Sequence, residues 1–248
     1  MAALLAVEGL SKRFGGLTVV DKLSFEVAEG DAVGIVGPNG AGKTTLLNLV
    51  AGDLRADSGA VILDGVDVTR RPADVRCHMG IGRTSQIPRP FEGLTVFENV
   101  LVGSTFGSGR AQRAATAQSV EALAVGALER VGMLRLANTA AGALTLLERK
   151  RLELARALAT EPRLLLLDEI AGGLTEGEVL ELVATIRDIR GAGVAVVWIE
   201  HIVHALLRVV DRMIAVDFGR KLIEGPPAEV MASDEVRSVY LGEDIEAA

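Results

Sequence analysis

Apolar residues occur in short runs separated by glycine, proline and polar turns, a pattern that predicts strands alternating with helices. Strands are expected over these runs: 17–20, 23–27, 33–36, 61–63, 163–168, 194–199, 213–216 and 221–223. Helices are expected over 119–131, 149–159, 178–189 and the residues that follow Pro226-Pro227. Asp64-Gly65 has the composition of a two-residue hairpin turn.

The alternation of strands and helices is confined to the first and last parts of the chain. From about residue 91 to residue 159 the periodicity is mainly helical. Strand and helix alternation indicates a parallel α/β core, and the helical middle indicates an inserted subdomain. We therefore expect one domain over 1–248, in which about 1–86 and 160–248 form the β-containing part and about 87–159 the helical part.

Composition narrows the classes of partner. The formal net charge of -7 gives no general attraction to nucleic acid or to an anionic membrane. One cysteine excludes an internal disulfide and fits a reducing compartment. No apolar run approaches the roughly 18 residues of a membrane-spanning helix. We expect a soluble, cytoplasmic chain whose contact with a membrane would come through a partner.

A glycine-rich stretch, GPNGAGKTT, lies between the apolar runs AVGIV and LLNLV. It matches G-x-x-x-x-G-K-[ST] in the strand–loop–helix context that this motif requires. Gly37, Gly40 and Gly42 let the backbone turn tightly and approach phosphate oxygens, and the helix start offers free N–H groups to an anion. Lys43 can reach the β- and γ-phosphates and Thr44 can bind Mg²⁺. The stretch therefore predicts a nucleoside triphosphate site.

Two adjacent carboxylates, Asp168 and Glu169, end the run RLLLL. Because burying a charge is costly, they either sit at a solvated strand end or serve a site that needs negative charge. The phosphate-binding motif favours the second alternative. A carboxylate at a strand end near Mg²⁺ suits Asp168, and Glu169 is placed to orient or deprotonate the attacking water.

Polar residues also follow two other predicted strands. His201 comes after the run 194–199, and Gln86 follows the short run 80–83. Parallel α/β sheets bind ligands at the carboxyl ends of their strands. We expect these side chains, the two carboxylates and the phosphate-binding stretch to meet at one edge of the sheet.

Together these residues resemble the nucleotide-binding subunit of ABC transporters, and especially the ATP-binding subunits of branched-chain amino acid importers. The resemblance covers nearly the whole chain. Its supporting stretches are KRFGGLTVVDKLSFEV, GPNGAGKTTLLNLVAG, RTSQIPRPFEGLTVFENV, RLELARALATEPRLLLLDE and WIEHIVHALLRVVDRMIAVDFGRKLIEG. The resemblance implies a P-loop ATPase core of α/β class with an N-terminal antiparallel β subdomain and an inserted α-helical subdomain.

The resemblance also implies roles for matching residues. Phe14 would stack on the adenine of ATP, although without the family match a core or surface phenylalanine is about as good an interpretation. Gln86 would touch Mg²⁺ and signal to the membrane subunit, and His201 would contact the γ-phosphate. Asp168 would support Mg²⁺, and Glu169 would be the catalytic base. The phosphates and Mg²⁺ would be held by Gly37, Pro38, Asn39, Gly40, Ala41, Gly42, Lys43, Thr44 and Thr45.

The family signature, usually Leu-Ser-Gly-Gly-Gln, falls on LTLLE at residues 144–148. In the family this motif comes from the opposite subunit and closes over the γ-phosphate. Thr145 keeps a hydroxyl, but both glycines are replaced. If position 147 needs a positive φ, Leu147 costs about 1–2 kcal/mol and closure is slowed. Thr145 and Glu148 also form a capping-box pattern, so we expect Thr145 both to cap a helix and to bind nucleotide.

Two smaller departures follow the catalytic pair. Ile170 replaces the usual proline, and Thr175 stands where the family commonly has Asp or Asn. With the altered signature, they indicate either a subfamily with its own signature or an asymmetric heterodimer in which one site is weak.

The leading hypothesis is an ATPase subunit that drives an importer for amino acids or similar small solutes. Its partners would be membrane-spanning permease subunits, a second ATPase subunit in a homodimer or heterodimer and, indirectly, a solute-binding protein, with the chain held at the inner face of the plasma membrane. The proline-stiffened apolar run 87–91 is either a docking surface for a membrane-subunit helix or a packed loop.

Other functions remain open. An exporter ATPase is the alternative within transport. A non-transport ABC ATPase acting on nucleic acid or ribosomes is disfavoured by the acidic net charge. A regulator that binds but does not hydrolyse ATP is favoured by the altered signature and disfavoured by the intact pair of Asp168 and Glu169.

Overall fold

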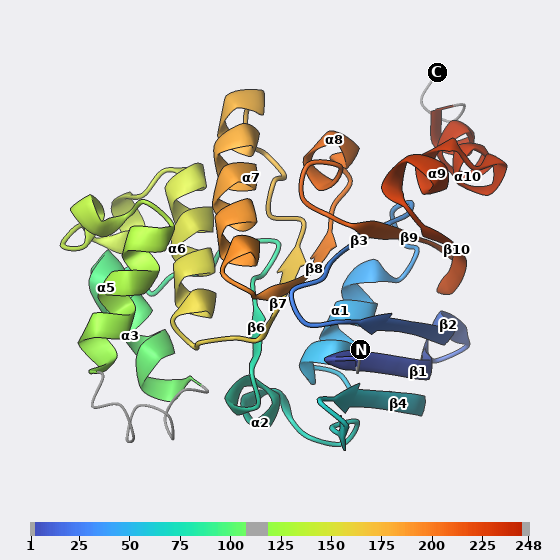
Figure 1. Ribbon diagram of the computed structural model, residues 1–248, viewed down its shortest axis with the longest axis horizontal. Helices are drawn as coiled ribbons and strands as arrows, with labels where there is room; N and C mark the ends of the chain where they lie inside the picture. The colour runs from blue at the N-terminus through green and yellow to red at the C-terminus, as the bar shows by residue number, and fades with distance from the viewer. Residues whose placement is uncertain (1–2, 108–118, 245–248) are drawn as a thin grey trace. The chain divides into compact units, whose positions relative to one another are not determined.

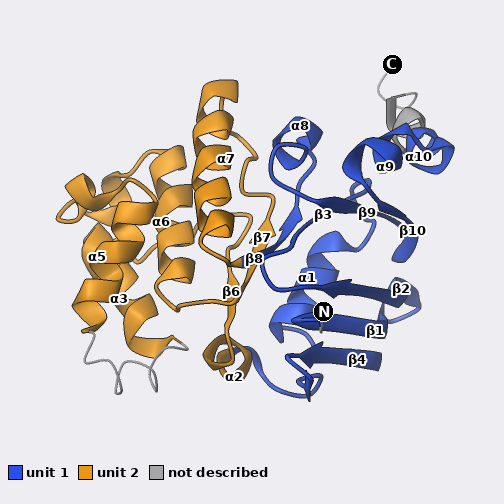
Figure 2. Cartoon of the chain, in the orientation of Figure 1, with its two compact units in different colours: residues 1–73, 195–248 blue, residues 74–194 orange. Residues whose placement is uncertain are grey.

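The computed structural model describes residues 3–107 and 119–244. The chain forms two compact units, drawn in different colours in Figure 2. Unit 1 comprises Met1–Ala73 and Ala195–Ala248, and unit 2 comprises Asp74–Val194. Unit 1 is thus built from both ends of the chain, and unit 2 is inserted between them.

Unit 1 contains an antiparallel sheet of four strands in the order β2-β1-β4-β5 (Figure 1). The strands are β1 (Leu5–Phe14), β2 (Leu17–Val27), β4 (Ser58–Leu63) and β5 (Val66–Asp67). The turn between β4 and β5 is Asp64-Gly65, with φ values of 50° and 75°. This is the predicted two-residue hairpin, because a turn of this kind needs positive φ at both central residues.

These strands differ from the sequence expectation in two ways. The runs 17–20 and 23–27 belong to one strand, β2, which continues through Lys22 at a φ of 48° while its register with β1 shifts. Strand β1 was not expected, because polar residues such as Lys12 and Arg13 interrupt its apolar pattern. Pairing with β2 on one side and β4 on the other holds β1 in the sheet despite that pattern.

The second sheet of unit 1 runs in the order β10-β9-β3-β8. Its strands are β3 (Ala32–Val36), β8 (Ala195–Ile199), β9 (Arg212–Asp217) and β10 (Arg220–Gly225). Strand β3 pairs in parallel with both β8 and β9, and β9 pairs antiparallel with β10. Every residue of β3 and β8 is buried, including Trp198, which explains their uninterrupted apolar sequences.

The described residues of unit 1 include the helices α1 (Lys43–Ala51), α8 (Val203–Leu206), α9 (Pro227–Ala232) and α10 (Asp234–Asp244). Helix α1 follows β3 directly, as the glycine-rich motif requires. Helix α9 begins at the predicted proline pair, because a proline in the first turn lacks only an N–H that has no partner within the helix.

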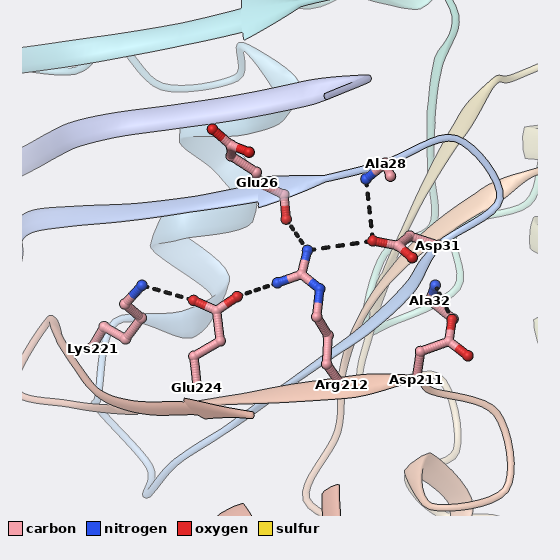
Figure 3. A network of polar contacts seen from close by, with 8 residues as sticks. All are labelled: Glu26, Ala28, Asp31, Ala32, Asp211, Arg212, Lys221 and Glu224. Carbon is pink, nitrogen blue, oxygen red and sulfur yellow. Dashed lines mark hydrogen bonds and ion pairs between the residues drawn. The ribbon is translucent and has the colours of Figure 1, made fainter. Parts of the chain in front are cut away.

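Arg212, at the start of β9, links the two sheets of unit 1 (Figure 3). Its guanidinium donates to the backbone carbonyl of Glu26 at the end of β2 and to the carboxylate of Glu224 on β10. It also lies 3.5 Å from the carboxylate of Asp31, which precedes β3. Lys221 binds the same Glu224 carboxylate at 2.7 Å. One side chain therefore joins the antiparallel sheet to the mixed one.

Unit 2 contains the parallel pair β6 (Ile81–Arg83) and β7 (Leu164–Asp168), and all five residues of β7 are buried. The helices among its described residues include α3 (Val96–Phe106), α5 (Val120–Arg130), α6 (Leu146–Leu158) and α7 (Glu176–Gly191), and short 3-10 turns lie at Leu134–Leu136 and Ala141–Ala143. A short helix, α2 (Ala73–His78), lies where the chain enters the unit. Helices α3, α5 and α6 lie in the range where the periodicity is mainly helical, and the boundaries expected for the helical part, about 87–159, stay a prediction.

Each of the main helices described in unit 2 has a serine or threonine at its N-cap. Thr95, Ser119, Thr145 and Thr175 are the N-caps of α3, α5, α6 and α7. Helix α6 begins at Leu146, directly after the capping threonine, and thus before the run 149–159 that the apolar periodicity predicted. Helices α3, α5 and α6 pack on one another (Figure 1). Among the residues described, no helix is both long and apolar enough to cross a bilayer.

Candidate nucleotide-binding site

The phosphate-binding stretch in unit 1 turns between β3 and α1. Gly37, Gly40 and Gly42 have φ values of 152°, 80° and 95°, which favour glycine. A Cβ at Gly37 would lie 2.0 Å from the carbonyl oxygen of Val216, and one at Gly42 would lie 2.3 Å from that of Val19. Conformation and the close approach of β9 and β2 therefore both favour glycine at Gly37 and Gly42, whereas conformation alone favours it at Gly40.

Lys43 occupies the interior of this stretch. Its side chain is buried, and its ammonium donates to the carbonyl oxygens of Gly37 at 2.7 Å and Pro38 at 2.8 Å. Helix α1 begins at Lys43 and has no acidic residue in its first turn. The positive end of the helix dipole and the ammonium provide positive charge for an anion.

The other residues of the stretch differ in their exposure. Asn39 and Gly40 form its exposed tip, and Ala41 is buried with its carbonyl accepting a hydrogen bond of 3.0 Å from the backbone of Gly219. Thr44 is exposed and Thr45 is half-buried at the start of α1.

Phe14 and His201 also belong to unit 1. Phe14 ends β1 with 48% of its surface exposed, and the ammonium of Lys12 lies 5.6 Å from its ring centroid. His201 follows β8 and is exposed. The buried carboxylate of Glu200 accepts the backbone N–H groups of His201 at 3.0 Å and Ile202 at 3.3 Å. Glu200, which was not singled out from the sequence, fixes the turn that presents His201.

The paired carboxylates lie in unit 2. Asp168 is the last residue of β7, is buried, and lies 3.6 Å from the guanidinium of Arg83 at the end of β6. Glu169 follows at a φ of 46°, and its Oε2 accepts a hydrogen bond of 2.5 Å from the side-chain amide of Gln86. Gln86 and Glu169 therefore meet at the ends of adjacent parallel strands. Phe14, Lys43 and His201 belong to the other unit, and the roles assigned to all these residues stay predictions.

The altered signature forms the start of α6. Thr145 donates through its backbone N–H and its hydroxyl to the Glu148 carboxylate at 2.9 and 3.0 Å, and its hydroxyl accepts the Glu148 N–H at 3.4 Å. The predicted capping box is confirmed. Leu147 is a buried residue of the helical first turn and does not have a positive φ. The backbone strain considered from the sequence therefore does not arise.

Residues 85–91, called here the Gln86 loop, leave β6 and approach α3. Ile87 and Phe91 are 67% and 47% exposed, as expected for this apolar run. The guanidinium of Arg156 on α6 lies 4.8 Å from the Phe91 ring centroid. Nothing in the sequence around Arg156 indicates this loop as its partner.

Two family models match the chain. The model described as ABC transporter matches residues 20–172. The model described as Branched-chain amino acid ATP-binding cassette transporter matches residues 220–246.

Similar proteins match over nearly the full length. The chain is 38% identical over 251 residues to the high-affinity branched-chain amino acid transport ATP-binding protein LivG of Salmonella typhimurium, covering 97% of this chain and 98% of LivG. It is 35% identical over 247 residues to the lipopolysaccharide export system ATP-binding protein LptB of Acidithiobacillus ferridurans, covering 99% and 100%. The solved ADP conformation of MJ1267, an ATP-binding cassette of an ABC transporter, matches with a TM-score of 0.87 and 29% identity, covering 98% and 100%.

Proposed function

This chain belongs to the ABC transporter family of ATP-binding proteins, whose cassettes are ATPases, and we propose that it energises an importer of branched-chain or related amino acids or similar small organic solutes. The observation that carries the importer assignment is the similarity to LivG over 97% of this chain. The branched-chain amino acid transporter model over residues 220–246 supports the same class of solute.

ATP binds on the phosphate-binding stretch in this proposal. Phe14 stacks on the adenine, and the backbone from Gly37 to Thr45 surrounds the phosphates. The ammonium of Lys43 exchanges its contacts with loop carbonyls for contacts with the β- and γ-phosphates. Support for this comes from its buried position between the carbonyl oxygens of Gly37 and Pro38.

Hydrolysis is assigned to Glu169. Its carboxylate accepts a proton from water as the water oxygen bonds to the γ-phosphorus. The bond from that phosphorus to the bridging oxygen breaks, leaving ADP and inorganic phosphate. His201 contacts the γ-phosphate from the turn that Glu200 fixes.

Mg²⁺ accompanies the nucleotide in this proposal. The expected ligands offer a hydroxyl from Thr44, an amide oxygen from Gln86 and a carboxylate from Asp168, and such hard oxygen donors suit Mg²⁺. Bound with ATP, Mg²⁺ would neutralise charge on the phosphate oxygens. The burial of Asp168 next to Arg83 fits a carboxylate whose charge is matched by nearby cations.

ABC ATPase subunits act with membrane permease subunits and form dimers. For this chain we assign the exposed Ile87 and Phe91 to permease docking, which would hold the chain at the inner face of the membrane. A second ATPase subunit, identical or related, completes the pair, and a solute-binding protein acts indirectly through the permease. Thr145 faces nucleotide from the start of α6 while it caps that helix.

An exporter ATPase is the second candidate function, favoured by the similarity to LptB over 99% of this chain. The two functions differ in their response to a solute-binding protein. Complexes isolated from native membranes through a tag on this chain are reconstituted in vesicles. A rise in ATP hydrolysis on adding leucine-loaded binding protein is expected for the importer, and no rise supports the exporter.

Steady-state ATP hydrolysis by the purified chain, measured against protein concentration, tests the ATPase assignment. A rate that rises faster than linearly is expected, because two copies must meet. The variant Glu169→Gln keeps the shape of the base but cannot take the proton, so it should bind ATP and lose hydrolysis. Equal rates for the two proteins at every concentration would contradict hydrolysis by a homodimer of this chain.

A further inference from the structure

One face of α6 holds the Gln86 loop. The carboxylate of Glu153 accepts the backbone N–H of Ser85 at 3.1 Å. The guanidinium of Arg156 donates to the carbonyl oxygen of Arg89 at 2.9 Å and lies over the Phe91 ring at 4.8 Å. Glu153 and Arg156 are three residues apart and therefore share a helix face. Helix α6 thus contacts the loop at its first, middle and last parts.

The far end of the Gln86 loop is fixed separately. Asn99 on α3 is fully buried, and its side chain accepts the N–H of Phe91 at 2.9 Å and donates to the Phe91 carbonyl at 3.1 Å. Both ends of the loop are therefore anchored, which limits where Gln86 can lie. From that position the Gln86 amide donates to the Glu169 carboxylate at 2.5 Å.

The charges on α6 are held at a cost. Burial raises the pKa of Glu153, although the Ser85 hydrogen bonds and the charge of Arg156 oppose that rise. Burial also lowers the pKa of Arg156, against the attraction of Glu153. Removing two charges from water often stabilises a fold less than apolar residues of similar volume would. The contacts that these two groups make with the loop are therefore a better explanation of their positions than a gain in stability.

We propose that Arg156 is a positioning residue for ATP hydrolysis. By holding the Arg89 carbonyl and the Phe91 ring it fixes the Gln86 loop, and Gln86 in turn keeps the Glu169 carboxylate in place. The inference rests on the proposed function, since it takes Glu169 as the base. A partner docked on Phe91 would therefore contact a residue that Arg156 also contacts. Phe91 lies close in the chain to Gln86, whose amide orients the base.

The test compares the same substitution at two arginines of α6. Arg156→Met removes the contacts to the loop. Arg151→Met is the matched control, because Arg151 binds Glu181 on α7 at 2.7 Å instead. Each purified variant is assayed for kcat and KM with ATP, and hydrogen–deuterium exchange is followed over residues 85–91.

Arg156→Met should lower kcat about tenfold, because small misplacements of a catalytic group are costly, and should leave KM within about twofold. Exchange over the loop should accelerate in the same variant. Arg151→Met should change neither quantity. Arg156→Lys keeps a cation near Phe91 but lacks the planar guanidinium, so it should recover part of the lost kcat. If the methionine variant does not fold, Arg156→Lys is compared with the wild type in its place.

The proposal is overturned if Arg156→Met matches Arg151→Met in kcat and in loop exchange. It is also overturned if kcat falls while the loop exchanges as in the wild type, because Arg156 would then act by another route. A wild-type chain without hydrolysis would remove the proposed function instead. In that case the comparison of loop exchange between Arg156→Met and the wild type decides whether Arg156 positions the loop. Unchanged exchange would overturn that role for Arg156.

Discussion

The side-chain amide of Gln86 donates a hydrogen bond of 2.5 Å to Oε2 of Glu169, across 83 positions of sequence. The contact joins the end of β6 to the end of β7. It gives the carboxylate assigned as the base a fixed donor, because an amide nitrogen can only donate.

Gln86→Ala should lower kcat for ATP hydrolysis about tenfold, because the base loses the group that orients it. The same change made in Glu169→Gln should have no further effect on hydrolysis, since residues acting as a unit are not additive. The four proteins of this cycle are compared by single-turnover hydrolysis. Equal proportional losses from Gln86→Ala in both backgrounds would show that Gln86 acts independently of Glu169.

Phe91→Asp should abolish assembly with the membrane subunits while leaving ATP binding intact, because a charge replaces the exposed aromatic ring of the proposed docking surface. Phe106 is a matched control, being a phenylalanine of the same unit that is 65% exposed. The measurement is co-purification from native membranes with a tag on this chain. Unchanged recovery of membrane subunits with Phe91→Asp would remove the docking assignment.

Thr145→Ala should destabilise the fold by about 1 kcal/mol, because α6 loses its side-chain cap. Thr175→Ala removes the equivalent cap of α7 and should cost a similar amount in urea unfolding. Only Thr145→Ala should also reduce ATP hydrolysis, since Thr145 is assigned to the nucleotide as well. If both variants hydrolyse ATP alike after correction for the folded fraction, Thr145 is a cap and nothing more.

Arg212→Met should destabilise unit 1 by about 1–2 kcal/mol, because the link between its two sheets is lost and hydrogen bonds to a charged group are stronger than neutral ones. Arg220→Met is the control; its ion pair with Asp21 is largely exposed and should contribute about 0–1 kcal/mol. Chemical unfolding followed by circular dichroism measures both. A larger loss from Arg220→Met would contradict the role given to Arg212.

The raised pKa of Glu153 predicts a pH dependence of stability. Burial is the leading cause, so the folded state binds a proton more tightly than the unfolded state. The free energy of unfolding should therefore fall as pH rises from the ordinary carboxyl range through the folded pKa, and level off above it. Glu153→Gln should flatten this contribution while an amide oxygen still accepts the Ser85 N–H. Glu129→Gln is the matched control for replacing a helical carboxylate by an amide, because Glu129 is an exposed residue of α5.

Local chemistry made several features readable from the sequence. The hairpin turn at Asp64-Gly65 and the capping box of Thr145 and Glu148 each depend on residues a few positions apart. The strand that ends at Asp168 is buried throughout, so its uninterrupted run of leucines predicted a buried strand. The phosphate-binding stretch could be recognised for the same reason, since its glycines adopt positive φ values that favour glycine, and a Cβ at Gly37 or Gly42 would meet a backbone carbonyl oxygen.

Contacts between residues far apart in the chain could not be predicted from the sequence. Strand β1 forms despite its polar residues because it is paired on both sides. Arg83, Arg156 and Arg212 contact carboxylates, carbonyls and a ring from other elements. The sequence periodicity around a long charged side chain does not indicate which group it contacts. The candidate functional residues were therefore predictable from the sequence, because motifs, helix caps and buried strands each depend on neighbouring residues. The structure decided what holds Gln86 and Glu169 together, because those contacts depend on the packing of segments far apart in the chain.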